Sequence, residues 1–494
     1  MTTLEERSTA ASDPVRPGGP AGLAADTLSA ASLESLLDDA PISRFHRRAV
    51  VVSGVGFFTD AYDLFVISTV AVLVQAQWNL SAATASWVSG SAILGAFVGA
   101  LVFGRLADHF GRRRIYGIVA GVMITGAVAA AASPNVAWLI GARFVLGLGI
   151  GGDYPVSAVL MSEYSNRKDR GKLVGLVFSM QAVGLVVGPL VAMALLGSGL
   201  SHDLTWRLLL GLGAVPAASV VYLRTKMPES PRFQARVQGR KDDAARQLER
   251  FSGGTFALSG SAPPPAGNGD GAMRRWRFRD ILRDRRTLRL LIGTAGAWFL
   301  FDYAYYGNTL SLPAILHAVD ATATLIEKLA LTLALFVVFA VPGYLLAIHR
   351  MDRIGHRRLQ RLGFGVMAAA FVALGAIAPL TSVLGAFIAV FGISYFFIEF
   401  GPNTTTFVLP SEVFPTRMRT TGHGTAAGIG KLGAFIGVFL VPLLQSSVGL
   451  RGMLFVAGAA SFAGLLITRL IPEPGGRSLE EISGEDELPV EQEQ

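Results

Sequence analysis

The sequence predicts an all-α polytopic membrane protein with about twelve transmembrane helices in two pseudo-symmetric bundles of six. Hydrophobic residues make up 51% of the 494 residues and charged residues only 16%, which is too apolar for an ordinary soluble protein of this length. Long apolar stretches form two groups separated by a polar interval, and short patterns of the first group return in the second. Both features indicate a repeated helical unit.

Each apolar stretch can cross about 30 Å of hydrocarbon, which takes roughly 20 helical residues. The first six lie near residues 49–74, 84–107, 114–132, 136–161, 171–197 and 207–224, and the second six near 288–316, 324–349, 360–378, 382–410, 418–446 and 451–471. The predicted domains are an N-terminal tail (1–48), a six-helix bundle (49–224), a linker (225–287), a second six-helix bundle (288–471) and an acidic tail (472–494).

The charges of the short loops predict the orientation. Loops after the second, fourth, eighth and tenth stretches are rich in Arg and Lys, and the intervening loops near 75–83, 133–135 and 379–381 carry no charge. By the positive-inside rule, both termini are cytoplasmic. The loops account for the net charge of +8 without a nucleic-acid partner. We expect the linker to be a solvated connector with amphipathic pieces at the membrane surface, and the acidic tail to be a solvated end.

A charged loop pattern occurs in both bundles. The stretch 104–114 contains Asp108 followed by Gly111 and three arginines, and it returns in altered form at 351–358. Two copies of a six-span unit are typical of secondary transporters, in which the halves alternate around a central site. Because carboxylate and guanidinium groups pair well, we predict a cytoplasmic gate formed by these loops. Its residues are Asp108, Arg112, Arg113, Asp352 and Arg353.

Polar residues within the apolar stretches predict a binding site for a small anion. Trp298, Asp302 and Tyr306 are spaced by four and share one helix face. Lys431 lies in a glycine-rich apolar run, and an ammonium group at membrane depth needs an anionic partner. With the neighbouring hydrogen-bonding residues, the predicted substrate site consists of Tyr154, Gln181, Trp298, Asp302, Tyr306, Asn403 and Lys431.

Each of these residues also has a structural interpretation. The aromatic residues could pack within the bundle or lie at the membrane interface. Gln181 and Asn403 could join helices by hydrogen bonds. Asp302 and Lys431 could form an ion pair that binds no ligand.

Four carboxylates at membrane depth are candidates for proton coupling. A charged group at the bilayer centre costs roughly 2.5–3.5 kcal/mol on insertion scales and usually has a function. Asp60 and Asp63 share a helix face, and Asp153 follows the apolar run 137–150. With Asp302, they can take up and release protons. We expect the other two intramembrane charges, Arg143 and Glu399, to pair within the bundle.

Longer motifs resemble a known family. The 104–114 loop and the stretches 228–232, 472–475 and 478–482 resemble the major facilitator superfamily near its sugar porters. The stretches 57–63, 151–155, 298–307 and 400–407 resemble the proton-coupled inorganic phosphate symporters of fungi and plants. The resemblance covers about 49–482. It implies the major facilitator fold and a phosphate pocket formed by the seven substrate-site residues, with proton-accepting aspartates at the matching positions. The symporters have an acidic residue where this chain reads Gly117-Ile118-Val119-Ala120.

Three interpretations of function remain. The first is a proton-coupled phosphate symporter of the plasma membrane that works as a monomer by alternating access. The second is a transporter of an organic anion, such as an aromatic acid, or of a sugar, and the third is a phosphate sensor that does not transport. An enzyme is disfavoured because no nucleophile and base occur at a suitable spacing. The sequence predicts no metal site and no cofactor, and it contains no cysteine.

Overall fold

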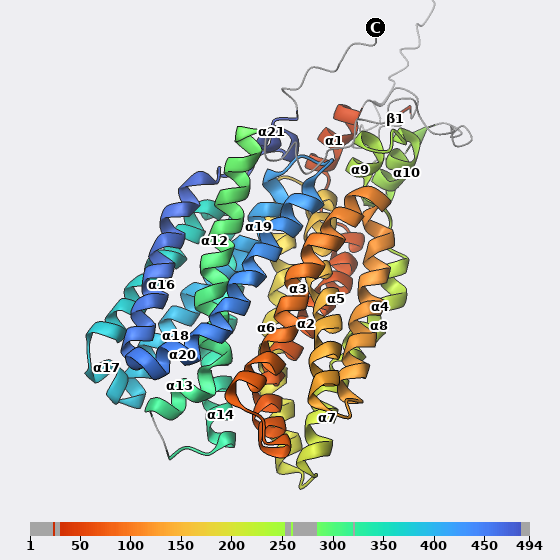
Figure 1. Cartoon of the computed structure of the whole chain (residues 1–494). Helices are drawn as coiled ribbons and strands as arrows, with labels where there is room; N and C mark the ends of the chain where they lie inside the picture. Colours follow the sequence, from red (N-terminus) through yellow and green to blue (C-terminus); the bar gives the residue numbers. More distant parts are fainter. Residues whose placement is uncertain (1–22, 25–29, 252–257, 260–283, 320–321, 486–494) are drawn as a thin grey trace, which may run out of the picture.

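The structure is a computed structural model and describes residues 23–24, 30–251, 258–259, 284–319 and 322–485. Helices dominate it, and the long ones run side by side in two lobes (Figure 1). The strands of the described part are β1 (Leu23–Ala24) and β2 (Leu258–Ser259), which pair in parallel. Apart from this pair of two-residue strands, the regular elements of the described residues are helices. The predicted all-α membrane fold is therefore confirmed.

The first half of the chain forms the N lobe. Ser43 begins its first long helix by accepting a hydrogen bond from the backbone N–H of Phe45, which satisfies an amide group that the helix leaves unpaired. The helices are α2 (Arg44–Trp78), α3 (Ala82–Phe110), α4 (Arg112–Ala131), α5 (Val136–Tyr164), α6 (Arg170–Gly197) and the pair α7 (His202–Leu212) and α8 (Ala214–Thr225).

The second half forms the C lobe, in which several spans are interrupted. The elements are α12 (Arg285–Leu310), α13 (Leu312–Val319), α14 (Leu325–Leu335), η2 (Phe336–Ala340), α15 (Val341–Ile354), α16 (His356–Ala376), α17 (Pro379–Ser382), α18 (Leu384–Ile398), η3 (Glu399–Asn403), α19 (Thr404–Val413), α20 (Arg419–Ile467) and η4 (Thr468–Leu470). Within α20, Gly449 adopts a φ of 71°. That angle favours glycine and lets α20 turn back and cross twice.

Eleven segments of the described chain are long and apolar enough to cross a membrane. The additional long helix is α12, which has 26 residues and buries Asp302, Asn308 and two tyrosines. It packs along α20, so its polar groups lie inside the C lobe rather than against lipid. The twelve spans predicted from the sequence are thus present.

Glycines bring helices of the N lobe into backbone contact. A Cβ atom added at Gly99 would lie 2.1 Å from the carbonyl oxygen of Leu148, and one added at Gly151 would lie 2.0 Å from that of Ala96. Only glycine allows α3 and α5 to approach this closely. Small residues are a common means of helix packing in membranes, where lipid removes the hydrophobic driving force between helices.

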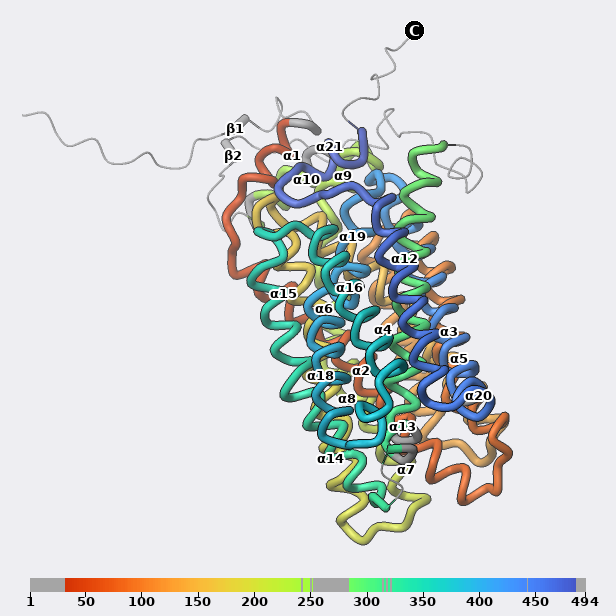
Figure 2. The backbone as a smooth tube through the Cα atoms, turned by 90° about the vertical axis from the view of Figure 1, so that its left-hand side faces the viewer, coloured from red at the N-terminus to blue at the C-terminus, as the bar shows by residue number. Residues whose placement is uncertain are grey.

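One end of the molecule carries the basic loops and four short helices, and we call it the basic end (Figure 1). The short helices are α1 (Ala30–Asp39), α9 (Pro231–Arg236), α10 (Lys241–Phe251) and α21 (Leu479–Ser483). Figure 2 shows the same end with α1, α9, α10 and α21 lying across the ends of the long helices. Arg232 of α9 is completely buried and Glu480 of α21 is 3% exposed. The prediction of a solvated connector and a solvated acidic tail was therefore wrong for Arg232 and Glu480, because these two charges are buried and pair with each other. Residues 252–257, 260–283 and 486–494 lie outside the described residues.

Replacing Gly99 by leucine should destabilise the N lobe, because the new side chain meets the backbone of α5. Overpacking of this kind typically costs about 1–3 kcal/mol. We expect the midpoint of thermal unfolding in detergent to fall by several degrees. The matched control is Gly365→Leu, since a Cβ atom at Gly365 has no neighbour within 4 Å. Equal midpoints for the two variants would contradict the role of this glycine contact.

Candidate functional site

The C-lobe half of the site is centred on a buried ion pair. Lys431 of α20 lies 3.2 Å from Asp302 of α12 (Nζ to Oδ2), and it donates a hydrogen bond of 3.0 Å to the hydroxyl of Tyr306. Both charged side chains are at most 2% exposed. The four-residue spacing along α12 places Asp302 and Tyr306 on the same side of that helix.

The N-lobe half is centred on Asp60 of α2. Its Oδ2 atom accepts a hydrogen bond of 2.6 Å from the hydroxyl of Tyr154 of α5 and one of 3.3 Å from Nε2 of Gln181 of α6. Gln181 also donates to the Tyr154 hydroxyl at 3.1 Å. Three helices thus bring polar groups to one carboxylate.

The two halves meet directly. The ammonium of Lys431 lies 4.6 Å from the centre of the Tyr154 ring, and the rings of Tyr154 and Trp298 are 6.0 Å apart. Such a cation above an aromatic face is stabilised by the ring quadrupole. The cluster therefore spans both lobes at the level where α5, α12 and α20 approach one another.

A second bridge between the lobes involves a residue that the sequence analysis missed. Tyr344 of α15 donates a hydrogen bond of 3.1 Å to Oε1 of Gln181 and accepts one of 2.8 Å from Nδ2 of Asn403. Asn403 ends the π-helical turn η3, where Gly401 has non-helical angles and Pro402 lacks an amide donor. A single tyrosine in an apolar span has no spacing pattern, which is why Tyr344 was not predicted.

All seven residues of the predicted substrate site thus belong to one cluster of side chains, none of them more than 4% exposed. The cluster combines one ammonium, two carboxylates and several neutral donors. This donor set suits a small oxyanion, because the ammonium can neutralise it and the hydroxyl, indole and amide groups can donate to its oxygens.

The remaining proton-coupling candidates lie apart from this cluster. Asp153 forms two bonds to the guanidinium of Arg224, at 2.8 and 3.0 Å, and Asp63 lies 3.3 Å from Arg143. The structure thus places Asp60 and Asp302 in the central cluster but gives Asp63 and Asp153 their own cationic partners. Arg143 pairs within the bundle as expected. Glu399 was expected to pair as well, but no cation forms an ion pair with it in the described part of the chain.

The first predicted gate loop connects the lobes at the basic end. Asp108 accepts hydrogen bonds from the amide and the hydroxyl of Thr421, both at 2.7 Å. Arg112 contacts Asp108 at 3.2 Å and Glu163 at 3.3 Å, and it donates to the carbonyl of Thr416 across the lobe interface at 2.8 Å. These bonds hold α3 and α5 against the C lobe.

The second loop has the same arrangement with a different cation. Asp352 accepts a hydrogen bond of 2.9 Å from the amide of Lys172 in the other lobe. His356 bridges Asp352 at 3.1 Å and Glu412 at 2.8 Å, so it takes the place that Arg112 has in the N lobe. The guanidinium of Arg113 bonds within its own lobe, to the carbonyl of Thr225, and Arg353 is exposed.

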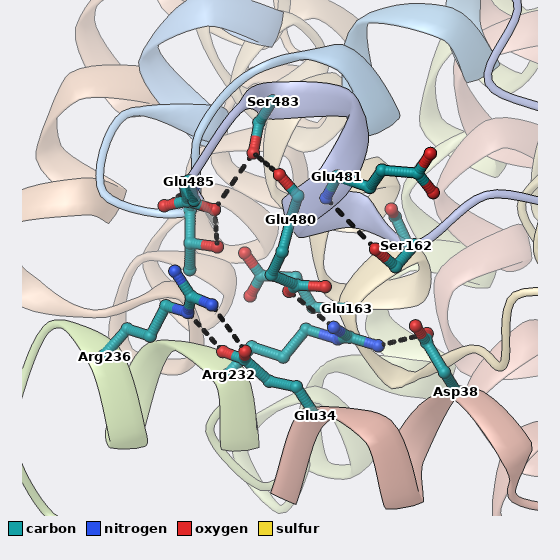
Figure 3. A network of polar contacts seen from close by, with 12 residues as sticks. Glu34, Asp38, Ser162, Glu163, Arg232, Arg236, Glu480, Glu481, Ser483 and Glu485 are labelled. Atoms are coloured by element: carbon teal, nitrogen blue, oxygen red, sulfur yellow. Dashed lines mark hydrogen bonds and ion pairs between the residues drawn. The ribbon is translucent and has the colours of Figure 1, made fainter. Parts of the chain in front are cut away.

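A third group of charges at the basic end joins α1, α9 and α21 (Figure 3). Arg232 lies 2.6 Å from Asp38 and 2.5 Å from Glu480, and Arg170 lies 3.1 Å from Asp38. Burial raises the pKa of Glu480, but the positive charges of Arg232 and Arg419 and the hydrogen bond from Arg232 together outweigh burial and lower the pKa to about 2. One guanidinium group therefore ties together the segments that precede, connect and follow the two lobes.

Comparison with known proteins agrees with this architecture. The family profile described as "Sugar (and other) transporter" matches residues 49–485. "Inorganic phosphate transporter 1-6" of Oryza sativa subsp. japonica is 37% identical, over 92% of this chain and 95% of that protein. "Low affinity inorganic phosphate transporter 4" of Petunia hybrida is 36% identical, over 91% of this chain and 94% of that protein.

Solved structures show the same fold. The proton:xylose symporter XylE of the major facilitator superfamily, bound to 6-bromo-6-deoxy-D-glucose, superposes with a TM-score of 0.75 at 20% identity and covers 90% of this chain and 99% of its own. The inward open conformation of XylE from E. coli superposes with a TM-score of 0.64 at 20% identity and covers 88% of this chain and 98% of its own. With its profile match over both lobes, the chain belongs to the sugar (and other) transporter family, is a relative of plant inorganic phosphate transporters and has the fold of the major facilitator symporter XylE.

Proposed function

We propose that this protein is a proton-coupled symporter that takes up inorganic phosphate by alternating access. The observation that carries the proposal is the central cluster, in which Lys431 meets Asp302 and the N-lobe residue Tyr154. The names of the relatives, which are inorganic phosphate transporters, support the choice of anion.

The charges of the cluster suggest how protons and the anion are coupled. When Asp60 and Asp302 are both ionised, the cluster holds two negative charges and the single positive charge of Lys431. An added anion is then repelled. Protonation of either carboxylate removes this repulsion, and loss of the proton restores it. Phosphate binds with a proton and leaves after the proton leaves.

We propose that the basic end faces the cytoplasm, which places both termini there, since its loops carry the excess of Arg and Lys. The contacts of Asp108, Arg112, Asp352 and His356 then form a cytoplasmic gate that is closed in this structure. The gate must open to release phosphate.

The proposed location is the plasma membrane, and the proposed functional unit is the monomer, because the site lies between two lobes of one chain.

Removal of the buried charges should abolish uptake. Truncating one partner of a buried ion pair typically costs about 3–5 kcal/mol, so Lys431→Ala and Asp302→Asn should each lower phosphate uptake into proteoliposomes by more than about tenfold, the equivalent of about 1.4 kcal/mol. The measurement is radioactive phosphate uptake under an inward proton gradient. Lys328→Ala, far from the cluster at the other end of the bundle, is the control. Normal uptake by both site variants would refute the pocket.

Competition should separate the candidate substrates. Arsenate has the shape and charge of phosphate and should inhibit uptake strongly, whereas benzoate and hexoses should not. Inhibition by benzoate alone would favour the organic-anion alternative, in which the aromatic side chains hold the ring. Phosphate binding without any flux would favour the sensor.

Opening of the cytoplasmic gate can be followed chemically, since the chain has no cysteine of its own. Ser162 is completely buried and donates to the carbonyl of Ser411 across the interface. In a Ser162→Cys background, Asp108→Asn should speed maleimide labelling severalfold, because the bonds to Thr421 are weakened. Asp203→Asn, at the opposite end, should leave the rate unchanged. Equal rates in both variants would show that Asp108 does not hold the gate.

A further inference from the structure

Glu399 is a buried carboxyl group that the proposed cycle has not used. It begins the π-helical turn η3, directly after α18, and it is completely buried. The aspartates of the central spans named above each pair with a cation or, in the case of Asp60, lie close to the charge of Lys431. Glu399 differs from all of them.

The partners of Glu399 are neutral. Its Oε2 atom accepts a hydrogen bond of 2.5 Å from Nδ2 of Asn403. Its Oε1 atom is buried and has no hydrogen-bond partner in the described part of the chain. The titratable groups that face it are the hydroxyls of Tyr305 from α12, Tyr344 from α15 and Tyr395 from α18.

Among the described residues, no charged side chain faces Glu399 from the neighbouring helices. From α16, Gly363 lies against Gly401 and Pro402, and from α15, Gly343 lies against the Cβ atom of Glu399. An ionised carboxylate in such surroundings loses its hydration without gaining a counter-charge, which is strongly unfavourable. A protonated carboxyl group is neutral and can donate its O–H, so this environment favours the protonated form.

A line of hydrogen bonds joins this carboxyl group to the anion site. Asn403 donates both to Glu399 and to the hydroxyl of Tyr344 at 2.8 Å. Tyr344 donates across the lobe interface to Gln181 at 3.1 Å, and Gln181 donates to Asp60 at 3.3 Å. The line therefore runs from a carboxyl group of the C lobe to one of the N lobe.

The single hydroxyl proton of Tyr344 makes the lobe contact sensitive to the charge of Glu399. In this structure that proton goes to Gln181. An ionised carboxylate is a stronger acceptor than an amide oxygen, so loss of the proton from Glu399 would draw the Tyr344 hydroxyl away from Gln181. Protonation of Glu399 thus favours the bridged lobes, and deprotonation favours their separation.

We propose that Glu399 is a further proton-binding site, on the C lobe, that is loaded while Tyr344 bridges to Gln181 and emptied when this bridge breaks. A proton from external water forms the O–H bond on Glu399, and the same proton passes to cytoplasmic water after the gate opens. The proposal rests on the proposed symport. It also supplies a proton beyond the one at the anion site, which monovalent phosphate needs if its uptake is to gain from the membrane potential.

The first test compares Glu399→Gln, which mimics the protonated carboxyl group, with the unaltered protein in proteoliposomes. The rate of phosphate counterflow, which needs no net proton movement, should stay within about twofold of that of the unaltered protein. The number of protons entering per phosphate, measured with an internal pH dye, should fall by one, and uptake should depend less steeply on external pH. Glu327→Gln, at the end of α14 remote from the site, should match the unaltered protein. An unchanged proton ratio and pH profile in Glu399→Gln would overturn the proposal.

The second test needs neither transport nor phosphate. Infrared difference spectra between acid and alkaline pH should contain a carboxylic acid C=O band that is absent from Glu399→Gln and shifted in Glu399→Asp. If Glu399→Gln does not fold, Glu399→Asp supplies the comparison. A missing band would overturn the proton site even in an active symporter. Absence of phosphate uptake with the band present would instead contradict the proposed function and leave the proton site supported.

Discussion

The cost of placing a charge in hydrocarbon organises this molecule. Each ionisable group at membrane depth must be neutralised or paired, and several find their partners on helices far away in sequence. Lys431 of α20 forms an ion pair with Asp302 of α12, and Asp153 of α5 forms one with Arg224 of α8. The charges that no local sequence can satisfy therefore dictate how the helices are arranged. The candidate site lies between the lobes, where the charges of Asp60, Asp302 and Lys431 come close to one another.

The same electrostatic logic controls the basic end. Asp108 and Asp352 each accept a backbone amide of the opposite lobe, and each is held by a cation that also binds a glutamate. Two equivalent contacts therefore close the interface, one beside α20 and one beside α6. They differ in their cation, which is Arg112 at the first contact and His356 at the second.

Much of the architecture could be predicted from the sequence because hydrocarbon allows few solutions. The spans, the repeat and the face of α12 that carries Trp298 and Tyr306 follow from length and periodicity. The cationic partner of Asp153 and the pairs at the basic end could not be predicted in this way. Arg224 lies at the end of a predicted span, where the sequence does not show whether it belongs to the span or to the loop. Arg232 and Glu480 belong to polar segments, and the composition of such a segment is the same whether its charges pair with one another or face water. Their burial depends on how α1, α9 and α21 fold back over the bundles, which is a tertiary property.

The glycine contacts between α3 and α5 have a mechanical consequence. At these glycines no side chain separates the two backbones, so we expect α3 and α5 to move together as one rigid unit. Asp108 lies near one end of α3, so a small shift there, when its bonds to Thr421 break, moves the far ends of both helices through a larger distance. The molecule can in this way transmit a displacement of a few atoms at one membrane surface to the other without deforming its interior.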